Sequence, residues 1–215
     1  GYNIAKKLLT KKNYQITIAD INFKKELNSK FKVIKADFTK QKAYKKLDNY
    51  YDQVYMMAAI VGVIKTILNP SDVIRVNASL VRQMLVWLEK AKIKKLLFAS
   101  SSENYAGTTD LVKNIVPTSE NGPITITDVK HPRWTYAITK ILGESAFLHT
   151  SKKLNFNSTI VRYQNAYGPD MGFRHVIPHL VLRFLMHDKR KPFIVYSYNQ
   201  TRSFCFITDA VEGTI

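Results

Sequence analysis

The sequence of 215 residues contains a single cysteine, Cys205. One thiol excludes an internal disulfide framework and is typical of proteins in a reducing cytosol. No uninterrupted apolar run is long enough to span a bilayer, and no secretory signal is recognisable among the first residues. We therefore expect a cytoplasmic protein with no membrane partner.

Acidic residues are scarce: 16 Asp and Glu face 33 Lys and Arg, which gives a formal net charge of +17. Such a balance raises the question of nucleic-acid binding. The lysines recur in every segment and form no single stripe with interleaved aromatic residues. This pattern favours a solvated lysine-rich surface, so we expect no nucleic-acid partner. It also suits a small anionic substrate such as a nucleotide diphosphate.

Several signatures of catalytic and metal sites are also missing. The sequence has no P-loop, no H-E-x-x-H and no nucleophile elbow. His175 and His179 have the spacing of a zinc pair, but Pro178 between them predicts a helix start that leaves His175 outside the helix. We therefore expect no metal site.

What remains is a globular composition, 46% hydrophobic, in which short apolar strands alternate with longer helical segments. This alternation predicts an α/β protein with a doubly wound parallel sheet. No internal repeat or low-complexity linker interrupts it. The expected strands are 15–19, 32–36, 53–59, 95–100 and 158–163, and the expected helices are 2–12, 72–90 and 136–151.

The two ends of the chain are abrupt. Gly1 opens a helix with no strand before it, yet the acidic Asp20 follows about 20 residues later at a strand end, which is the spacing of a dinucleotide-binding fold. We expect Gly1 to be the last glycine of a phosphate-binding turn whose earlier part is not in this sequence. The last helix, which begins after Ile207, also stops early, at Ile215.

The most informative stretch is Tyr136-Ala137-Ile138-Thr139-Lys140. Residues four apart project from one face of a helix, so the phenol and the ammonium are neighbours. An adjacent ammonium lowers the pKa of a phenol, and a tyrosine tuned in this way can take a proton from a sugar hydroxyl near neutral pH. On its own this pair is weak evidence, because the Y-x-x-x-K pattern arises often by chance.

Other residues make the pattern specific, because they follow in order over the whole chain. With them the sequence resembles the extended short-chain dehydrogenases/reductases that act as nucleotide-sugar epimerases, dehydratases and decarboxylases. The resemblance rests on Asp20, Asp37, Ala58-Ala59, Asn77, Ser100 to Tyr105, Tyr136, Lys140, Glu144, Arg162 to Pro169, Thr201 to Phe204 and Thr208-Asp209.

The resemblance implies NAD as the cofactor. Asp20 would bind the adenosine ribose hydroxyls and repel a 2′-phosphate, which favours NAD over NADP; a turn cap is its alternative role. Asp37 would lie near the adenine or cap residues 39–48. Ala58 and Ala59 would let the cofactor approach the backbone, although tight helix packing needs the same small residues. The other implied contacts are Gly1, Phe38, Asn77, Ser100, Tyr136, Lys140 and Tyr163.

The resemblance also implies the catalytic and substrate-binding residues. Ser101 would hydrogen-bond the reacting sugar oxygen beside Tyr136, or form only a polar turn. Lys140 would hold the nicotinamide ribose and lower the pKa of Tyr136. Ser102 and Asn165 would contact a nucleotide-diphosphate sugar. Arg202 would grip its diphosphate, or form a surface ion pair.

Glu103 bears on the type of reaction. Family dehydratases usually have Thr-Asp-Glu where this chain has Ser101-Ser102-Glu103, which counts against 4,6-dehydration. The order Ser/Thr-Ser-Glu resembles uronate decarboxylases and several epimerases. Glu103 is either an acid/base group or a residue that holds a neighbouring loop. We expect a nucleotide-sugar epimerase that works through a 4-keto sugar; a decarboxylase or dehydratase is the alternative, and a non-catalytic nucleotide-binding protein is a third.

The domain organisation follows from the same resemblance. We expect residues 1–165 to form a Rossmann-type NAD-binding domain and residues 166–215 to begin a smaller, interleaved substrate-binding domain. Residues 72–90 present an apolar stripe that could pack on a second copy as well as on the sheet, so a homodimer is expected. The stripe comprises Val73, Val76, Leu80, Met84 and Trp87.

Overall fold

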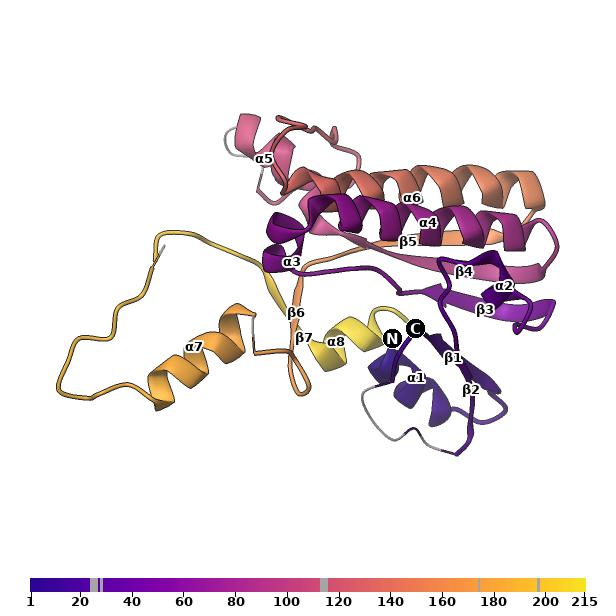
Figure 1. The fold of residues 1–215 in the computed structure, drawn as a ribbon, viewed down its shortest axis with the longest axis horizontal. Helices are drawn as coiled ribbons and strands as arrows, with labels where there is room; N and C mark the ends of the chain where they lie inside the picture. Colours follow the sequence, from indigo (N-terminus) through magenta and orange to yellow (C-terminus); the bar gives the residue numbers. More distant parts are fainter. Residues whose placement is uncertain (24–26, 28, 113–115, 174, 197) are drawn as a thin grey trace. The chain divides into compact units, whose positions relative to one another are not determined.

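The computed structural model describes residues 1–23, 27, 29–112, 116–173, 175–196 and 198–215. By its internal contacts the chain divides into two compact units, Gly1–Tyr163 and Gln164–Ile215. Each unit has parallel strands and helices of its own (Figure 1). The two units are described separately.

The first unit contains two parallel sheets. β1 (Ile16–Asp20) pairs with β2 (Phe31–Lys35). β3 (Tyr50–Met56), β4 (Lys92–Ser101) and β5 (Asn157–Tyr163) form a three-stranded sheet with β4 in the centre. Because all pairs are parallel, their carboxyl ends meet at one edge of each sheet, which is where ligands bind in open α/β folds.

The helices of the first unit differ greatly in length. Two long helices, α4 and α6, lie side by side over one face of the three-stranded sheet (Figure 1). The helices are α1 (Tyr2–Leu9), α2 (Gln41–Tyr44), α3 (Val63–Leu68), α4 (Pro70–Leu88), the 3-10 helix η1 (Ser102–Tyr105), α5 (Ala106–Leu111) and α6 (Trp134–Leu154).

The main core lies between the sheet and these two helices. Phe98 of β4 and Phe147 of α6 are both almost fully buried, and their ring centroids are 5.1 Å apart. α6 approaches β4 closely at Gly143, where an added β-carbon would stand 2.3 Å from the Phe98 ring. This close packing holds the amino-terminal half of α6, which carries Tyr136 and Lys140, against the carboxyl end of β4.

The predicted α/β architecture is confirmed, and the differences lie at the boundaries of elements. The third strand was expected at 53–59 but ends at Met56, so Ala58 and Ala59 follow the strand. The first helix was expected at 2–12 but ends at Leu9. α6 is longer than the expected 136–151 because it runs from Trp134 to Leu154.

The apolar stripe of α4 packs inside the chain. Val73, Leu80, Met84 and Trp87 are buried, at 0 to 8% exposure. They serve the core under α4, so the argument from this stripe to a homodimer was wrong. Other apolar side chains of the helix pair are exposed, namely Ile74 at 40%, Leu142 at 46% and Leu148 at 42%.

The second unit is small. Its two strands, β6 (Asn165–Tyr167) and β7 (Phe204–Phe206), pair in parallel, and its helices are α7 (Val176–Leu185) and α8 (Ile207–Glu212). His175 is the residue before α7, outside the helix as expected. Gly168 has φ 149°, and an added β-carbon would stand 2.5 Å from Ile207, so only glycine fits there.

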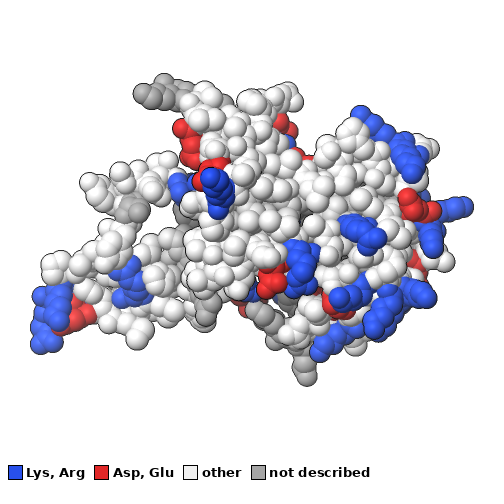
Figure 2. All heavy atoms as spheres, turned by 45° about the horizontal axis from the view of Figure 1, so that its top comes forward, with Lys and Arg blue, Asp and Glu red and all other residues white. Residues whose placement is uncertain are grey.

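The charged surface agrees with the expectation of scattered lysines. Figure 2 shows Lys and Arg side chains spread over the visible face with acidic side chains among them. Some form exposed ion pairs, such as Lys32 with Asp48 and Lys94 with Asp52, both at 2.7 Å. Among the described residues, no helix combines the length and the hydropathy that crossing a membrane requires.

Candidate active site

Ser101 and Tyr136 come together at the carboxyl end of β4. Ser101 is the last residue of β4 and Tyr136 is the third residue of α6. A hydrogen bond between the Ser101 and Tyr136 side chains lowers the pKa of the tyrosine, although burial raises it more. The Ser101 hydroxyl also accepts the backbone N–H of Glu103 at 3.2 Å. This second contact fixes the hydroxyl at the start of η1.

Lys140 lies one helical turn beyond Tyr136 and is 4% exposed. Its Nζ donates to the Ala99 carbonyl at 2.7 Å and lies 5.5 Å from the centre of the Tyr136 ring. Burial lowers the pKa of Lys140 to about 8. Ser101, Tyr136 and Lys140 are therefore neighbours, in the order that the sequence predicted.

The pKa of Tyr136 differs from the sequence-based expectation. Burial raises it above the usual value, the hydrogen bond from Ser101 lowers it, and the charge of Glu103 raises it further. The expected net lowering by Lys140 was therefore wrong for the protein without ligands. The physical reason is that burial penalises the phenolate more than the polar neighbours stabilise it.

The sequence analysis missed Arg133, which lies beside this group. Its guanidinium contacts the Glu103 carboxylate at 3.3 Å and Asp110 at 3.8 Å, and it lies over the Trp134 ring at 5.3 Å. All three charged side chains are about half exposed. The signal in the sequence was the position of Arg133, three residues before Tyr136, which places both on neighbouring turns at the start of α6.

Asn77 has a structural role in the loop after β3. Its Oδ1 accepts the Ile60 N–H at 2.7 Å, and its Nδ2 donates to the Ile60 carbonyl at 3.2 Å and to Thr139 Oγ1 at 3.3 Å. Asn77 thus ties the segment that contains Ala58 and Ala59 to α4 and α6. A cavity of about 10 Å³, the size of one water, is lined by Met56, Ala58, Ala59, Asn77, Val81, Phe98, Thr139 and Lys140.

The residues expected at the adenosine end lie at the carboxyl ends of β1 and β2. Asp20 ends β1, is exposed, and accepts the Asn22 N–H at 3.1 Å. Asp37 accepts the N–H and the hydroxyl of Thr39, which lower its pKa. Phe38 packs edge-on against Tyr44 in the core. Asp37 therefore stabilises a turn before α2 and does not cap that helix.

Gly1 lies near the loop after β3, because an added β-carbon would stand 3.8 Å from Met57. The exposed carboxylate of Asp20 and the small residues Gly1, Ala58 and Ala59 fit a dinucleotide, which needs close backbone approach at its diphosphate and an acceptor for its ribose. The chain therefore has residues of the right chemistry for NAD in the first unit.

Three further residues of the predicted set lie at the ends of β4 and β5. Tyr163 of β5 pairs with Ser101, and Ser100 pairs with Arg162. The Ser100 hydroxyl donates to Glu144. Ser102, which is half buried, begins η1. Ser100 thus has a buried partner of its own, while Tyr163 and Ser102 border the group around Ser101.

Two predicted substrate-binding residues belong to the second unit. The Asn165 side chain donates to the Ser203 carbonyl at 3.0 Å. The exposed Arg202 donates to the Thr201 carbonyl at 2.8 Å and to the Gln200 side chain at 3.1 Å. Both therefore lie around the start of β7.

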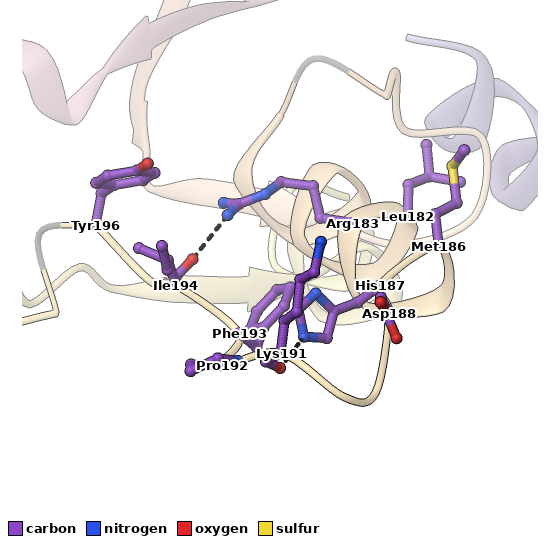
Figure 3. Close-up of a pocket in the computed structure, with 10 residues that line it drawn as sticks. All are labelled: Leu182, Arg183, Met186, His187, Asp188, Lys191, Pro192, Phe193, Ile194 and Tyr196. Carbon is purple, nitrogen blue, oxygen red and sulfur yellow. Dashed lines mark hydrogen bonds between the residues drawn. The ribbon is translucent and has the colours of Figure 1, made fainter.

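The second unit also contains a cavity of about 670 Å³ beside α7, which the sequence analysis did not predict (Figure 3). Arg183 donates to the Ile194 carbonyl at 2.7 Å, and its guanidinium lies over the rings of Phe193, at 5.2 Å, and Tyr196, at 5.7 Å. Aromatic rings and a guanidinium are suited to stacking against a flat ring. The individual residues carry no sequence signal for this cavity, because the turn after α7 brings them together.

Within the described part of the chain, no three His, Cys, Asp or Glu side chains are grouped so as to hold a metal ion.

Comparison with known proteins places this geometry in a family. Residues 1–215 match the model of the NAD dependent epimerase/dehydratase family. A UDP-N-acetyl-alpha-D-glucosaminuronate decarboxylase of Bacillus cytotoxicus is 33% identical over 225 residues, which cover 100% of this chain and 66% of that protein. The chain thus spans slightly less than two thirds of the length of this relative.

Solved structures share the fold of this chain. A UDP-galactose 4-epimerase superposes with a TM-score of 0.79 at 22% identity, over 100% of this chain and 66% of its own. The UDP-glucuronic acid 4-epimerase of Bacillus cereus, solved with UDP-glucuronic acid and NAD, has a TM-score of 0.76 at 25% identity, over 100% and 68%. The chain belongs to the NAD dependent epimerase/dehydratase family, an enzyme family whose cofactor is NAD.

Proposed function

We propose that the protein oxidises C4 of a nucleotide-diphosphate sugar to a 4-keto sugar and then completes the reaction on that ketone. The observation that carries the proposal is the hydrogen bond between Ser101 and Tyr136 beside the buried Lys140. A phenol, a hydroxyl and an ammonium in this order are suited to removing a proton from an alcohol.

Each of the three residues has a distinct task in this proposal. Tyr136 takes the proton of the sugar hydroxyl, and Ser101 holds the same oxygen through its own hydroxyl. Lys140 supplies positive charge when protonated, which favours the phenolate form of Tyr136. Bound NAD would accept the hydride from the sugar carbon, and it carries a positive charge when oxidised. Since burial lowers the pKa of Lys140 only to about 8, the ammonium form prevails at neutral pH.

The first candidate for the complete reaction is epimerisation. The ketone turns in the site, and the hydride that C4 gave up would return to its other face, so Tyr136 returns the proton that it took. This reaction needs no carboxylate near the sugar. The Bacillus cereus UDP-glucuronic acid 4-epimerase, solved with UDP-glucuronic acid and NAD, supports this candidate.

The second candidate is decarboxylation of a nucleotide-linked uronic acid, and Glu103 and Arg133 favour it. A uronate has a carboxylate next to the reacting carbons, and Arg133, which contacts Glu103, is a cation of suitable shape. The 33% identity to a uronate decarboxylase supports the same candidate. In this reaction the 4-ketone accepts the electron pair that the departing CO₂ leaves behind.

Product analysis separates the two candidates. The full-length protein is incubated with UDP-glucuronic acid, UDP-N-acetylglucosamine or UDP-galactose and NAD, and the products are identified by NMR. Loss of CO₂ from the uronate establishes the decarboxylase, whereas a sugar inverted only at C4 establishes the epimerase. If none of the three substrates yields either product, the proposed function is contradicted.

The Glu103→Gln variant then tests the role of the carboxylate. Gln keeps the size of the side chain and removes its charge. An epimerase should keep full activity in this variant. If the sugar is still oxidised but no product forms, Glu103 acts after oxidation. Asp110→Asn is the matched control, because Asp110 also contacts Arg133 but lies farther from it, at 3.8 Å.

We further propose that Asn165 and Arg202 hold the nucleotide diphosphate and that the cavity beside α7 takes the flat base. Arg202 has a forked donor suited to diphosphate oxygens, and Phe193 and Tyr196 offer ring faces. The protein is also proposed to act in the cytoplasm, which the single cysteine supports. Finally, it is proposed to form a homodimer, which the exposed Ile74, Leu142 and Leu148 support.

A further inference from the structure

A second cluster of polar side chains lies behind the proposed catalytic group and has no part in the steps described above. Its centre is Glu144 of α6, whose side chain is 7% exposed. Glu144 lies one turn beyond Lys140 and two turns beyond Tyr136, so the three share one face of the helix. A carboxylate this deeply buried is stable only if its charge is balanced and its oxygens are hydrogen-bonded.

Arg162 of β5 balances this charge through two parallel contacts. Its Nε donates to Glu144 Oε1 at 2.9 Å and its Nη2 donates to Oε2 at 2.7 Å. The third nitrogen, Nη1, donates to the Tyr105 hydroxyl at 2.6 Å, and the guanidinium lies over the Tyr105 ring at 4.7 Å. The ion pair between α6 and β5 therefore also contacts η1, through Tyr105.

Two more side chains donate hydrogen bonds to the Glu144 carboxylate. Ser100 Oγ donates to Glu144 Oε1, and Asn104 Nδ2 donates to the same oxygen at 2.7 Å and to Ser100 Oγ at 3.1 Å. Asn104 is 0% exposed and Ser100 is 4% exposed. Burial opposes the charged form of Glu144, but Arg162, Ser100 and Asn104 together outweigh it and lower the pKa of the carboxyl.

The position of Ser101 gives this cluster its significance. Ser100 precedes Ser101, and Asn104 and Tyr105 belong to the 3-10 helix that Ser101 caps. Ser100 and Asn104, on either side of Ser101, thus hydrogen-bond Glu144, and Tyr105 hydrogen-bonds its partner Arg162. Glu144 is on the same helix as Tyr136. The Ser101 hydroxyl itself contacts the Glu103 N–H and the Tyr136 side chain, as described above.

We propose that Glu144 and Arg162 are positioning residues. Their buried ion pair holds the Ser100–Tyr105 turn in place against α6, and so keeps the Ser101 hydroxyl hydrogen-bonded to the Tyr136 hydroxyl. This inference rests on the proposed function, since it gives these residues a task in that reaction. A merely structural pair would stabilise the fold without affecting the contact between Ser101 and Tyr136.

The test uses the full-length protein with both partners replaced, Glu144→Met with Arg162→Met. Removing a buried pair together avoids an unpaired charge and is often neutral for stability, whereas removing one partner is strongly destabilising. We expect the double variant to melt close to the unaltered protein. We expect its kcat for UDP-glucuronic acid, or for whichever of the three tested sugars is converted, to fall at least tenfold with little change in KM.

A second measurement needs no turnover. The Ser101 hydrogen bond lowers the pKa of Tyr136, so losing that contact should raise it. Titration of tyrosine labelled with ¹³C at Cζ, followed by NMR, reports this pKa directly. The double variant and Ser101→Ala should both show a higher pKa for Tyr136 than the unaltered protein. If the double variant does not fold, Arg162→Lys, which keeps the charge but not the parallel contacts, takes its place.

The control is an exposed ion pair within the three-stranded sheet to which Arg162 belongs. Asp52→Asn with Lys94→Met removes an exposed pair of β3 and β4 and should change neither kcat nor the pKa of Tyr136. A folded double variant at Glu144 and Arg162 with unchanged kcat and an unchanged Tyr136 pKa would overturn the inference. The proposed function fails separately, if Tyr136→Phe remains active.

Discussion

Burial acts in opposite directions on two residues that lie one turn apart. It raises the pKa of Tyr136 and lowers that of Lys140, because a buried site disfavours the charged form of either group. The sequence predicted that the two would be neighbours but not which effect would prevail. Before ligands bind, the site therefore holds a neutral phenol beside a lysine that loses its proton more readily than usual.

Lys140 should make the protein less stable at neutral pH. Its folded pKa of about 8 lies below the value of about 10.4 for an unfolded lysine. The folded state thus binds fewer protons between these two values, and stability rises with pH across that window. The cost of the buried charge is fully present below about pH 8.

We therefore expect Lys140→Met to raise the free energy of unfolding at pH 7 by about 2 kcal/mol, while abolishing activity. The gain should shrink as pH rises from about 8 to about 10. Urea unfolding at several pH values measures it. Lys95→Met, at an exposed position of β4, should show no such pH dependence. A Lys140→Met protein that is less stable at pH 7 would refute the expectation.

Asp20 should determine which dinucleotide binds. Its carboxylate is exposed at the end of β1, and a 2′-phosphate placed there would meet a like charge. Calorimetry on the full-length protein should give tighter binding of NAD than of NADP. Asp20→Asn should reduce that preference, whereas Asp52→Asn, on another strand, should not. Equal dissociation constants for the two cofactors in the unaltered protein would exclude this role.

At the scale of the elements, the position of α6 against β4 determines the site, because Ser101 is at the end of one and Tyr136 is at the start of the other. Gly143 allows the close approach, since the Phe98 ring occupies the space that a β-carbon would need. Phe98 is itself 2% exposed and cannot move into solvent. The interface is therefore closely packed.

Gly143→Ala tests this close packing. The added β-carbon would meet the Phe98 ring at 2.3 Å, and overpacking of this kind costs about 1–3 kcal/mol, more than the gain of up to about 1 kcal/mol in helix propensity. We expect a net loss of stability in urea unfolding. Ser145→Ala, exposed on the same helix, should change stability little. Phe98→Leu in the Gly143→Ala background should restore part of the loss; a neutral Gly143→Ala would contradict the packing argument.

The sequence predicted the presence of strands and helices better than the residues at which they begin and end. Alternating apolar strands and helices gave the architecture, but the apolar run from Gln53 to Ala59 continues past the point where β3 ends at Met56. Hydropathy does not mark that point, whereas pairing with β4 ends at Met56, and Asn77 then holds the backbone at Ile60. Such contacts join residues distant in sequence, so no local pattern reveals them.

The same limit applies to the site. Tyr136 and Lys140 could be predicted because helical spacing is local. The contact between Arg133 and Glu103 joins residues 30 apart, and that between Arg162 and Tyr105 joins residues 57 apart. Glu144 was recognised as part of a motif, but its four hydrogen bonds depend on the register of β4 and β5.

At the scale of the whole molecule, the exposed apolar side chains of the two long helices bear on the oligomeric state. The stripe of α4 is buried in the chain, but Ile74, Leu142 and Leu148 leave apolar area exposed on the two long helices. Exposed apolar patches often mark interaction sites. A second copy of the same helix pair would cover them in a symmetric dimer.

Light scattering on the full-length protein at micromolar concentration should therefore give the mass of a dimer. Leu142→Glu with Leu148→Glu should shift the mass toward the monomer without unfolding the protein, because both side chains are already exposed. Val112→Glu, at an exposed apolar residue outside α4 and α6, is the matched control. A monomeric mass for the unaltered protein would rule the dimer out.

The most direct test of the proposed chemistry is the turnover of Tyr136→Phe. Phe keeps the ring and removes only the hydroxyl that hydrogen-bonds Ser101. With UDP-glucuronic acid, or whichever of the tested sugars is converted, and NAD, we expect turnover of the full-length variant to fall at least about 10²-fold while its affinity for NAD, measured by calorimetry, is unchanged. Near-normal turnover in this variant would contradict the role of Tyr136 and the proposal built on it.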